Sequence, residues 1–287
     1  MAMTSLAELP RSRYDDPLAR IDWDFVDRDC WWLPPDALSL DGVPAFGALP
    51  QATRRAVSHL EYVHLLQAGL WLESLFMARL ATLAHLCEDV ARRVQFLHEV
   101  REEAGHSLMF VELLHRGGFD ARARQGFALR SVDALARLLP TGSALFWALV
   151  VAGEELPDRL NRKLQRGIED VTLSSVVFRM AQIHTREEAS HSAYARERCA
   201  EAAERTPAIL RALLSPVLSA AIDLYARYVY YPPAAAYADA GLPQPKRWRS
   251  LALANPVRRA QVVEMLRPTV SFLRRCGWHV HSRYAVA

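Results

Sequence analysis

The chain has 287 residues, of which 51% are hydrophobic and 23% are charged, and its formal net charge is +3. This length is sufficient to bury a full hydrophobic core, and the composition is that of an ordinary globular protein. Basic residues are interleaved with acidic ones and form no concentrated basic run, which argues against nucleic-acid binding.

Cysteine spacing and apolar runs indicate where the protein resides. The 4 cysteines are widely spaced and form no C-x-x-C pair, which excludes a zinc ribbon and fits a reducing cytoplasm. The N-terminus lacks a basic region followed by an apolar run, so we expect no signal peptide. The apolar run over residues 144–153 is too short to span a bilayer. We therefore expect a soluble, cytoplasmic protein without a membrane partner.

In chain order, residues 1–50 are rich in proline, aspartate and tryptophan and predict an irregular arm. From residue 51 onward the periodicity is helical, without strand-like alternation. The expected fold class is therefore all-α, as one domain with an arm (1–50), a helical bundle (51–204) and two or more additional helices (205–287). The predicted helices cover residues 52–86, 89–116, 143–166, 172–204, 207–230 and 256–276.

A short internal repeat lies in two of these helices. Residues 101–107, REEAGHS, recur as residues 186–192, REEASHS, with identity at six of seven positions. Each copy places a glutamate three residues before a histidine, as Glu103/His106 and Glu188/His191. Residues three apart share one face of an α-helix, so each pair can bind one metal ion.

Two-metal helical bundles add a single glutamate from each of two further helices. In an antiparallel helical hairpin, residues at one height are equidistant from the turn. Reflection of Glu103 through a turn near residue 88 gives Glu73, and reflection of Glu188 through Val171 gives Glu154. Both positions are glutamates, so the sequence predicts four carboxylates at one level of the bundle.

A third histidine joins this set. His184 lies four residues before Glu188 and seven before His191, on the helical stripe that carries Val177 and Met180. A buried stripe has no reason to carry ionisable groups unless their desolvation is compensated, and a bound metal compensates it. The predicted metal ligands are therefore Glu73, Glu103, His106, Glu154, His184, Glu188 and His191.

This set resembles the ligand set of the p-aminobenzoate N-oxygenase (AurF-like) family of di-iron oxygenases, in which a third histidine is added to the usual two. The resemblance covers residues 50–195 well and the remainder weakly. It implies a ferritin-like four-helix bundle, two iron ions, O2 as co-substrate and an amine-to-nitro or related oxidation. The resemblance assigns no substrate-binding residue in this sequence, so the substrate does not carry over.

Other glutamates and histidines have simpler interpretations. Two more Glu-x-x-His pairs, Glu61/His64 and Glu112/His115, are expected to be ordinary surface or rim residues. Glu155 shares a helical face with arginines and is expected to be solvated.

Several further residues near the repeat keep open roles. Arg101, Glu102, Arg186 and Glu187 are expected to form solvated pairs or to hydrogen-bond to ligands. Glu99 faces the core and is a hydrogen-bond acceptor for a ligand histidine, a substrate-binding group, an edge carboxylate or, less favoured, a ligand. Core packing is expected for Tyr194, and packing of the 207–230 helix on the bundle for Tyr225, Tyr228, Tyr230 and Tyr231.

Carboxylate and imidazole ligands without thiolate suit iron, or alternatively manganese. We expect Glu103 and Glu188 to bridge the ions and Glu73 and Glu154 to be terminal. His106 is expected on one ion, and His184 with His191 on the other.

The expected function is an O2-dependent oxygenase acting through a peroxo di-iron intermediate, preferably N-oxygenation of an arylamine or other small amine. The alternatives are a di-iron C-hydroxylase or desaturase and, from another class, a ferroxidase or iron-storage protein; peroxide removal by a manganese catalase is less favoured. The expected partners are O2, a small amine and an electron donor such as a reductase or ferredoxin. A homodimer is expected.

Overall fold

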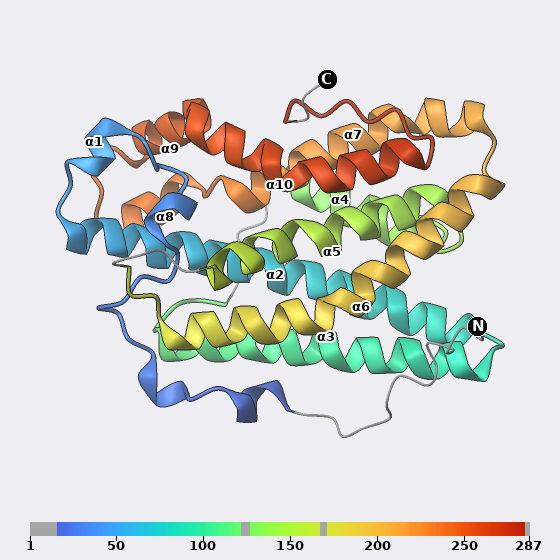
Figure 1. Cartoon of the computed structure of the whole chain (residues 1–287), viewed down its shortest axis with the longest axis horizontal. Helices are drawn as coiled ribbons and strands as arrows, with labels where there is room; N and C mark the ends of the chain where they lie inside the picture. The colour runs from blue at the N-terminus through green and yellow to red at the C-terminus, as the bar shows by residue number, and fades with distance from the viewer. Residues whose placement is uncertain (1–15, 122–126, 167–170, 285–287) are drawn as a thin grey trace.

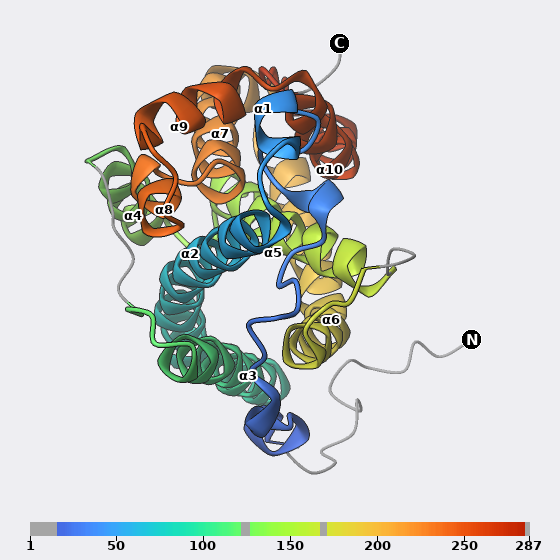
Figure 2. The ribbon, with the colours of Figure 1, turned by 90° about the vertical axis from the view of Figure 1, so that its left-hand side faces the viewer.

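The computed structural model describes residues 16–121, 127–166 and 171–284. Four long helices form a bundle in which α2 pairs with α3 and α5 pairs with α6 (Figures 1 and 2). Their bounds lie within three residues of the predicted ones, which confirms the all-α prediction. The bounds are Gln51–Leu86 (α2), Val90–Arg116 (α3), Ala144–Gln165 (α5) and Ser175–Arg205 (α6).

Short capped turns produce the two hairpins. Residues 87–89 separate α2 from α3, and the Asp89 side chain accepts hydrogen bonds from the first backbone N–H groups of α3. The Ser143 hydroxyl caps α5 in the same way, by accepting from Phe146 N. The turn of the second hairpin, predicted near residues 168–171, lies outside the described residues except for Val171.

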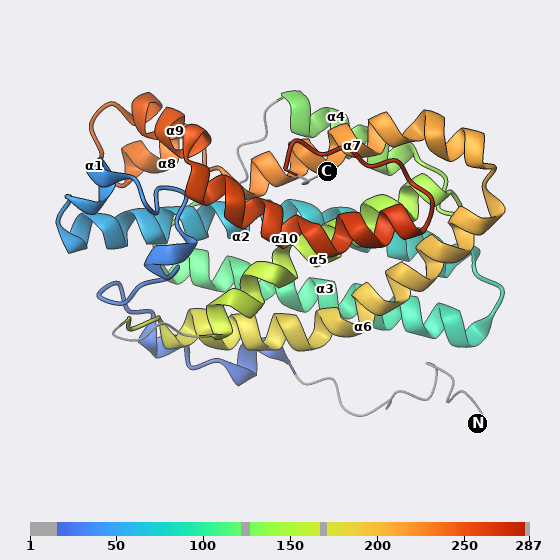
Figure 3. The ribbon, with the colours of Figure 1, turned by 45° about the horizontal axis from the view of Figure 1, so that its top comes forward.

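A second layer of helices covers α2 and α5. Helix α7 (Ala208–Tyr230) packs on α5, α2 and α4, and α10 (Pro256–Arg275) lies across α5 (Figure 3). The prediction that the tyrosine-rich helix packs on the bundle is confirmed. The predicted ranges did not include three shorter helices: α4 (Phe127–Leu138), α8 (Ala234–Asp239) and α9 (Pro245–Ala254).

The described part of the arm, from residue 16 to 50, runs along the bundle as loops with short helical turns, as expected. The turns are η2 (Pro17–Arg20), η3 (Trp23–Phe25), η4 (Pro35–Ala37) and α1 (Pro44–Gly47). The Ser58 hydroxyl of α2 fixes the arm, since it accepts hydrogen bonds from Trp32 N and Leu33 N and donates one to Leu33 O.

The arm explains why the expectation of a surface position for Glu61 and His64 is wrong. Both side chains are buried, because the arm and α7 cover this part of α2. The Glu61 carboxylate accepts hydrogen bonds from the backbone N–H and the hydroxyl of Ser39, and His64 Nε2 lies 2.6 Å from Tyr228 O. Periodicity in one helix cannot reveal cover supplied by a segment without periodicity.

Arg258 ties the arm to the second layer. Its guanidinium is 2% exposed and donates to Tyr230 O and Ala37 O. Arg258→Met is expected to lower the free energy of unfolding by about 3 kcal/mol, because it leaves these buried carbonyls without donors. Urea denaturation measures this loss. The exposed Arg259→Met is the matched control, and equal stability of the two variants would contradict the assignment.

One described segment, Ala208–Asp239, is long and apolar enough to cross a membrane by length and composition alone. Its most apolar window has a mean hydropathy of 1.5, and 33% of that window is buried in the protein. The apolar run that the sequence drew attention to, residues 144–153, is not this segment. Core helices of soluble proteins meet the same criterion.

Candidate metal centre

The seven predicted ligands meet inside the bundle. Glu73 comes from α2, Glu103 and His106 from α3, Glu154 from α5, and the remaining three from α6. Each of the seven is 6% exposed or less. Their oxygen and nitrogen atoms form two compact groups of four, and within each group one ligand atom from every residue lies within 4.8 Å of the others.

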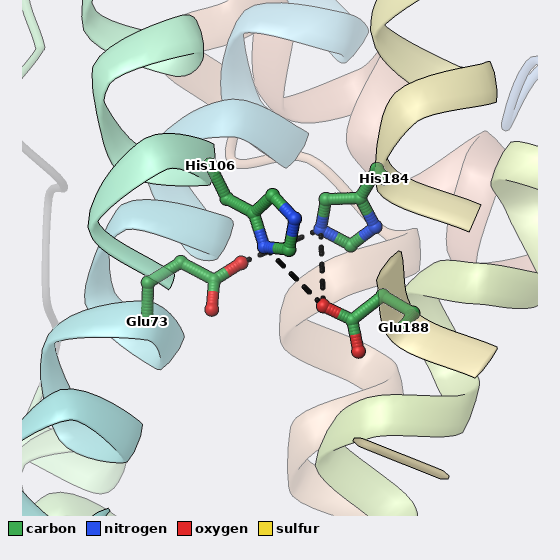
Figure 4. A group of neighbouring side chains, drawn as sticks. All are labelled: Glu73, His106, His184 and Glu188. Carbon is green, nitrogen blue, oxygen red and sulfur yellow. Dashed lines mark hydrogen bonds and ion pairs between the residues drawn. The ribbon is translucent and has the colours of Figure 1, made fainter. Parts of the chain in front are cut away.

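The first group contains Glu73, His106, His184 and Glu188 (Figure 4). Glu188 Oε1 lies 3.4 Å from His106 Nδ1 and 3.7 Å from His184 Nε2. His184 Nε2 also lies 3.4 Å from Glu73 Oε1. Two carboxylates and two imidazoles thus point their ligand atoms at one small volume.

The second group contains Glu103, Glu154, Glu188 and His191. His191 Nδ1 lies 3.0 Å from Glu103 Oε1 and 3.7 Å from Glu188 Oε2. Glu188 belongs to both groups, with one oxygen directed to each. Glu103 spans them as well, because its second oxygen lies 3.1 Å from His106 Nδ1. This is the arrangement expected of two bridging carboxylates.

His184 lies in the group that contains His106, whose ring centroid is 4.3 Å away, whereas His191 lies in the other group. Seven residues advance an α-helix by about 10 Å, so the two α6 histidines lie at different heights. The expectation that His184 and His191 share one ion stays a prediction.

The outward nitrogens of two histidines bond to carboxylates on the opposite helix. His106 of α3 has Nε2 3.0 Å from Glu187 Oε2 of α6, and His191 of α6 has Nε2 2.9 Å from Glu102 Oε2 of α3. In the repeat, Glu102 directly precedes Glu103, and Glu187 directly precedes Glu188. A carboxylate in this position fixes the imidazole ring and leaves Nδ1 to face the centre.

His184 and a residue of the arm make further contacts around the two groups. His184 Nδ1 lies 3.0 Å from Asn161 Nδ2, which leaves Nε2 toward the carboxylates. Arg20 of the arm forms an ion pair with Glu187 at 3.2 Å. The sequence predicted that Glu102 and Glu187 pair or hydrogen-bond to ligands, whereas it carried no signal for Asn161 or Arg20.

The contacts of Glu102 and Glu187 with the histidines can be tested by mutation. Glu187→Gln is expected to weaken the binding of one metal ion by about 10- to 100-fold, since the His106 ring loses its charged acceptor. Glu102→Gln is expected to weaken the second ion by a similar factor. Competition with a chromophoric chelator measures both constants, with the exposed Glu204→Gln as the control. Unchanged constants in both variants would contradict this role.

Protons balance the buried carboxylates when no metal is bound. Burial and the charge of Glu103 raise the pKa of Glu73 well above its usual value, and burial and the charge of Glu188 do so for Glu154. Burial also acts to raise the pKa of Glu103, but the neighbouring imidazoles hold it well below its usual value. Burial and the charge of Glu103 act to raise the pKa of Glu188. A hydrogen bond from Glu154 and the nearby imidazoles outweigh them and lower this pKa to about 2.

The pKa values of the three histidines are also shifted, one downward and two upward. Burial lowers the pKa of His184 to about 4. Burial opposes the charging of His106, but hydrogen bonds to Glu103 and Glu187 raise its pKa to about 10. His191 is raised well above its usual pKa, against burial, by the charge of Glu103 and its hydrogen bonds. These directions favour protonated Glu73, Glu154, His106 and His191 near neutral pH, and two divalent cations would supply the charge of these four protons.

Orphaned polar atoms show that the residues fit a metal. Glu103 Oε1, Glu188 Oε2 and His191 Nδ1 are buried without a hydrogen-bond partner. They approach one another to between 3.0 and 3.7 Å. With the imidazole neutral, a shared cation would be a partner for all three buried atoms.

Comparison with known proteins agrees with this geometry. The family model described as P-aminobenzoate N-oxygenase AurF matches residues 2–277. The chain belongs to the AurF family. AurF-family proteins are all-helical di-iron oxygenases, and the chain accordingly has the ferritin-like fold of that family.

Curated relatives add no activity to this assignment. The chain is similar to the uncharacterized proteins Rv0885 of Mycobacterium tuberculosis and Mb0909 of Mycobacterium bovis. Each is 24% identical over 272 residues, which cover 92% of this chain and 78% of the relative. No solved structure matches the chain at a significant level.

Helix α5, which carries Glu154, contains a proline whose missing hydrogen bond is replaced. The helix continues through Pro157. Proline has no N–H to offer the carbonyl four residues earlier, which belongs to Gly153. The Tyr225 hydroxyl of α7 donates to that carbonyl at 3.4 Å. A side chain at Gly153 would not fit, because its Cβ would lie 2.6 Å from the Phe76 ring.

Of two other acidic residues, Glu155 is not where the sequence predicted it, whereas Glu112 is. Glu155 is 3% exposed and forms an ion pair with Arg196 and a hydrogen bond with Thr269, so the expectation that it is solvated is wrong. Helices α6 and α10 supply these partners, which α5 alone could not indicate. Glu112 pairs with Arg116 at 2.6 Å on a half-buried surface, as expected for a rim residue.

Glu99 and Tyr194 lie just outside the centre. Glu99 is 7% exposed, accepts a hydrogen bond from Gln95, and belongs to neither group of ligand atoms. Burial raises its pKa to about 7. Tyr194 packs edge-on against Phe96 and Trp147, as expected for a core tyrosine.

Proposed function

We propose that this AurF-family chain binds two iron ions through the seven buried residues and uses them with O2 to oxygenate the nitrogen of a small amine. The two adjoining groups of ligand atoms that share Glu188 carry this proposal. Carboxylates and imidazoles without thiolate favour iron, with manganese as the alternative metal. Bound ferrous ions would supply the electrons that activate O2.

The protein residues have defined tasks in this proposal. Glu103 and Glu188 hold the two ions at a fixed separation, since each directs one oxygen to each group. Glu102 and Glu187 accept the outward N–H of the ligand imidazoles and keep the rings oriented. The closely packed apolar side chains around the centre exclude water from the reacting groups.

A third imidazole distinguishes this ligand set from simpler di-iron centres. His184 brings a neutral ligand in place of an anion or water, because its pKa is lowered to about 4. A more neutral, imidazole-rich environment favours oxygen transfer to an electron-rich atom such as an amine nitrogen. Hydroxylation or desaturation at carbon is the alternative within the same chemistry, and ferroxidase action with iron storage is the alternative from another class.

The test combines metal analysis with product analysis. Purified protein should contain two iron ions per chain, and the reduced protein exposed to O2 should convert an arylamine to hydroxylamine, nitroso or nitro products detected by mass spectrometry. Ring- or alkyl-hydroxylated products would favour the carbon alternative. A large hollow assembly that accumulates ferric mineral without amine turnover would favour storage. Absence of bound iron would contradict the proposal.

The proposal also includes an electron donor, a cellular location and an oligomeric state. A reductase or ferredoxin would return the centre to its ferrous form between turnovers. The four cysteines are all free thiols, which supports a reducing cytoplasm. A homodimer is the assembly we expect.

A further inference from the structure

Two adjoining cavities lie beside the proposed centre. The inner cavity has a volume of about 340 Å³, which includes space open to solvent, and it reaches the centre, because Glu154 and His191 form part of its wall. The outer chamber has a volume of about 590 Å³, which includes space open to solvent, and lies among α2, α4, α5 and α7. Both share the side chains of Phe76, Arg79, Phe146 and Val150 as a common wall.

The wall of the outer chamber is mostly hydrocarbon. Aromatic and aliphatic side chains such as Trp71, Leu75 and Ile222 line it, and small residues at Ala136 and Ala221 leave its volume open. No carboxylate lines it among the described residues. Such a chamber favours an apolar guest and penalises a charged one, which would lose its hydration without a partner.

Arg79 is the one cation in the described lining of the chamber, and it is bound to the protein itself. It donates two hydrogen bonds to the carbonyls of Arg137 and Leu139, at the C-terminal end of α4. Its guanidinium lies 5.1 Å from the centroid of the Phe146 ring, and its Nε has no hydrogen-bond partner. Backbone carbonyls thus hold both terminal nitrogens on the α4 side.

The inner cavity, unlike the outer chamber, has carboxylates in its described wall. Glu99 is the one carboxylate in its described lining besides the proposed ligand Glu154. Gln95 supplies a hydrogen bond to Glu99 Oε1 at 3.1 Å, and the carboxylate has further acceptor capacity. An amine N–H placed in this cavity would meet an acceptor there, next to the ligands.

We propose that the two cavities form one binding site for a small amine with an uncharged hydrocarbon or aryl body, so that carboxylated arylamines are selected against. The nitrogen lies in the inner cavity with its N–H donated to Glu99, and the hydrocarbon body occupies the outer chamber. This inference rests on the proposed function for its chemistry, but the binding it describes can be measured without turnover.

Two ligands of similar shape test the selection. We would titrate 4-ethylaniline and p-aminobenzoate into the anaerobic ferrous protein by calorimetry. Their difference is an ethyl group against a carboxylate, so the outer chamber alone should separate them. We expect 4-ethylaniline to bind at least tenfold more tightly, and equal or tighter binding of p-aminobenzoate would overturn the inference.

Filling the chamber tests the location. Ala221→Phe places a ring in the outer chamber, whereas Ala220→Phe places the same ring on the exposed face of α7. Ala136→Leu and the exposed Ala134→Leu form a second matched pair on α4, for use if Ala221→Phe does not fold. The chamber variants should weaken 4-ethylaniline at least tenfold with the control variants unchanged. Equal affinity within each pair would overturn the assignment.

Glu99→Gln tests the amine contact. The variant should retain two iron ions per chain, bind ethylbenzene as the native protein does, and bind 4-ethylaniline about tenfold more weakly. Loss of iron, or equal weakening of both ligands, would show that Glu99 acts on the centre or the fold instead. If the chain bound no iron at all, the proposed function would fail, and the same titrations on metal-free protein would still decide the binding inference.

Discussion

Glu188→Gln is expected to reduce the metal content from two ions per chain to fewer than one. Glu188 is the residue that both groups of ligand atoms share, and it directs one oxygen to each. An amide cannot bridge two cations as a carboxylate does, so both ions lose a ligand. Oxygenation of any substrate should fall by more than about 100-fold, since even residues that only support a ligand are worth 10- to 100-fold.

Metal analysis after gel filtration and a circular dichroism melt check this prediction together. Glutamine has nearly the volume of glutamate, so the helical signal should persist. Glu197→Gln, on the exposed face of the same helix, is the control and should keep both ions. Retention of two tightly bound ions in Glu188→Gln would show that the ions bind elsewhere or do not share this residue.

Loading of two ferrous ions at neutral pH is expected to release about four protons per chain. The metal-free chain keeps Glu73 and Glu154 protonated, because burial and neighbouring carboxylates raise the pKa of each. It keeps His106 and His191 as imidazoliums, because nearby carboxylates raise their pKa values, to about 10 for His106. Glu103, Glu188 and His184 release none, since their pKa values are lowered.

The sign of the pH effect follows from this count. The four groups must lose protons to bind metal, so the overall association constant rises with pH while pH stays below their raised pKa values. Near neutrality it should rise by up to about 10⁴ per pH unit for two ions. Calorimetry in two buffers of different ionisation enthalpy counts the protons. Release of one proton or fewer would contradict the charge balance described for the centre.

The ligand set could be predicted from the sequence because its signals are local. The two repeats place Glu103 with His106 and Glu188 with His191 by helical spacing alone. The single glutamates required only the further assumption of antiparallel hairpins joined by short turns. The observed loop at residues 87–89 satisfies that assumption for α2 and α3. Assignment of these residues as ligands remains a prediction.

Contacts between elements far apart in the sequence could not be predicted in this way. The grouping of His184 with His106 could not be predicted, because spacing along α6 defines a face but not which side chains of other helices reach it. Glu61 and Glu155 were expected at the surface because their partners, Ser39 and Arg196, lie in segments that pack there only after folding.

The sequence by itself determined the helices of the bundle, the level of its carboxylates and the family, since periodicity and spacing record which faces must be buried. Only the tertiary structure decided the division of the histidines between two groups, the burial of the arm contacts and the two cavities. Those features depend on distances between helices, and packing sets such distances through side chains contributed by every layer at once.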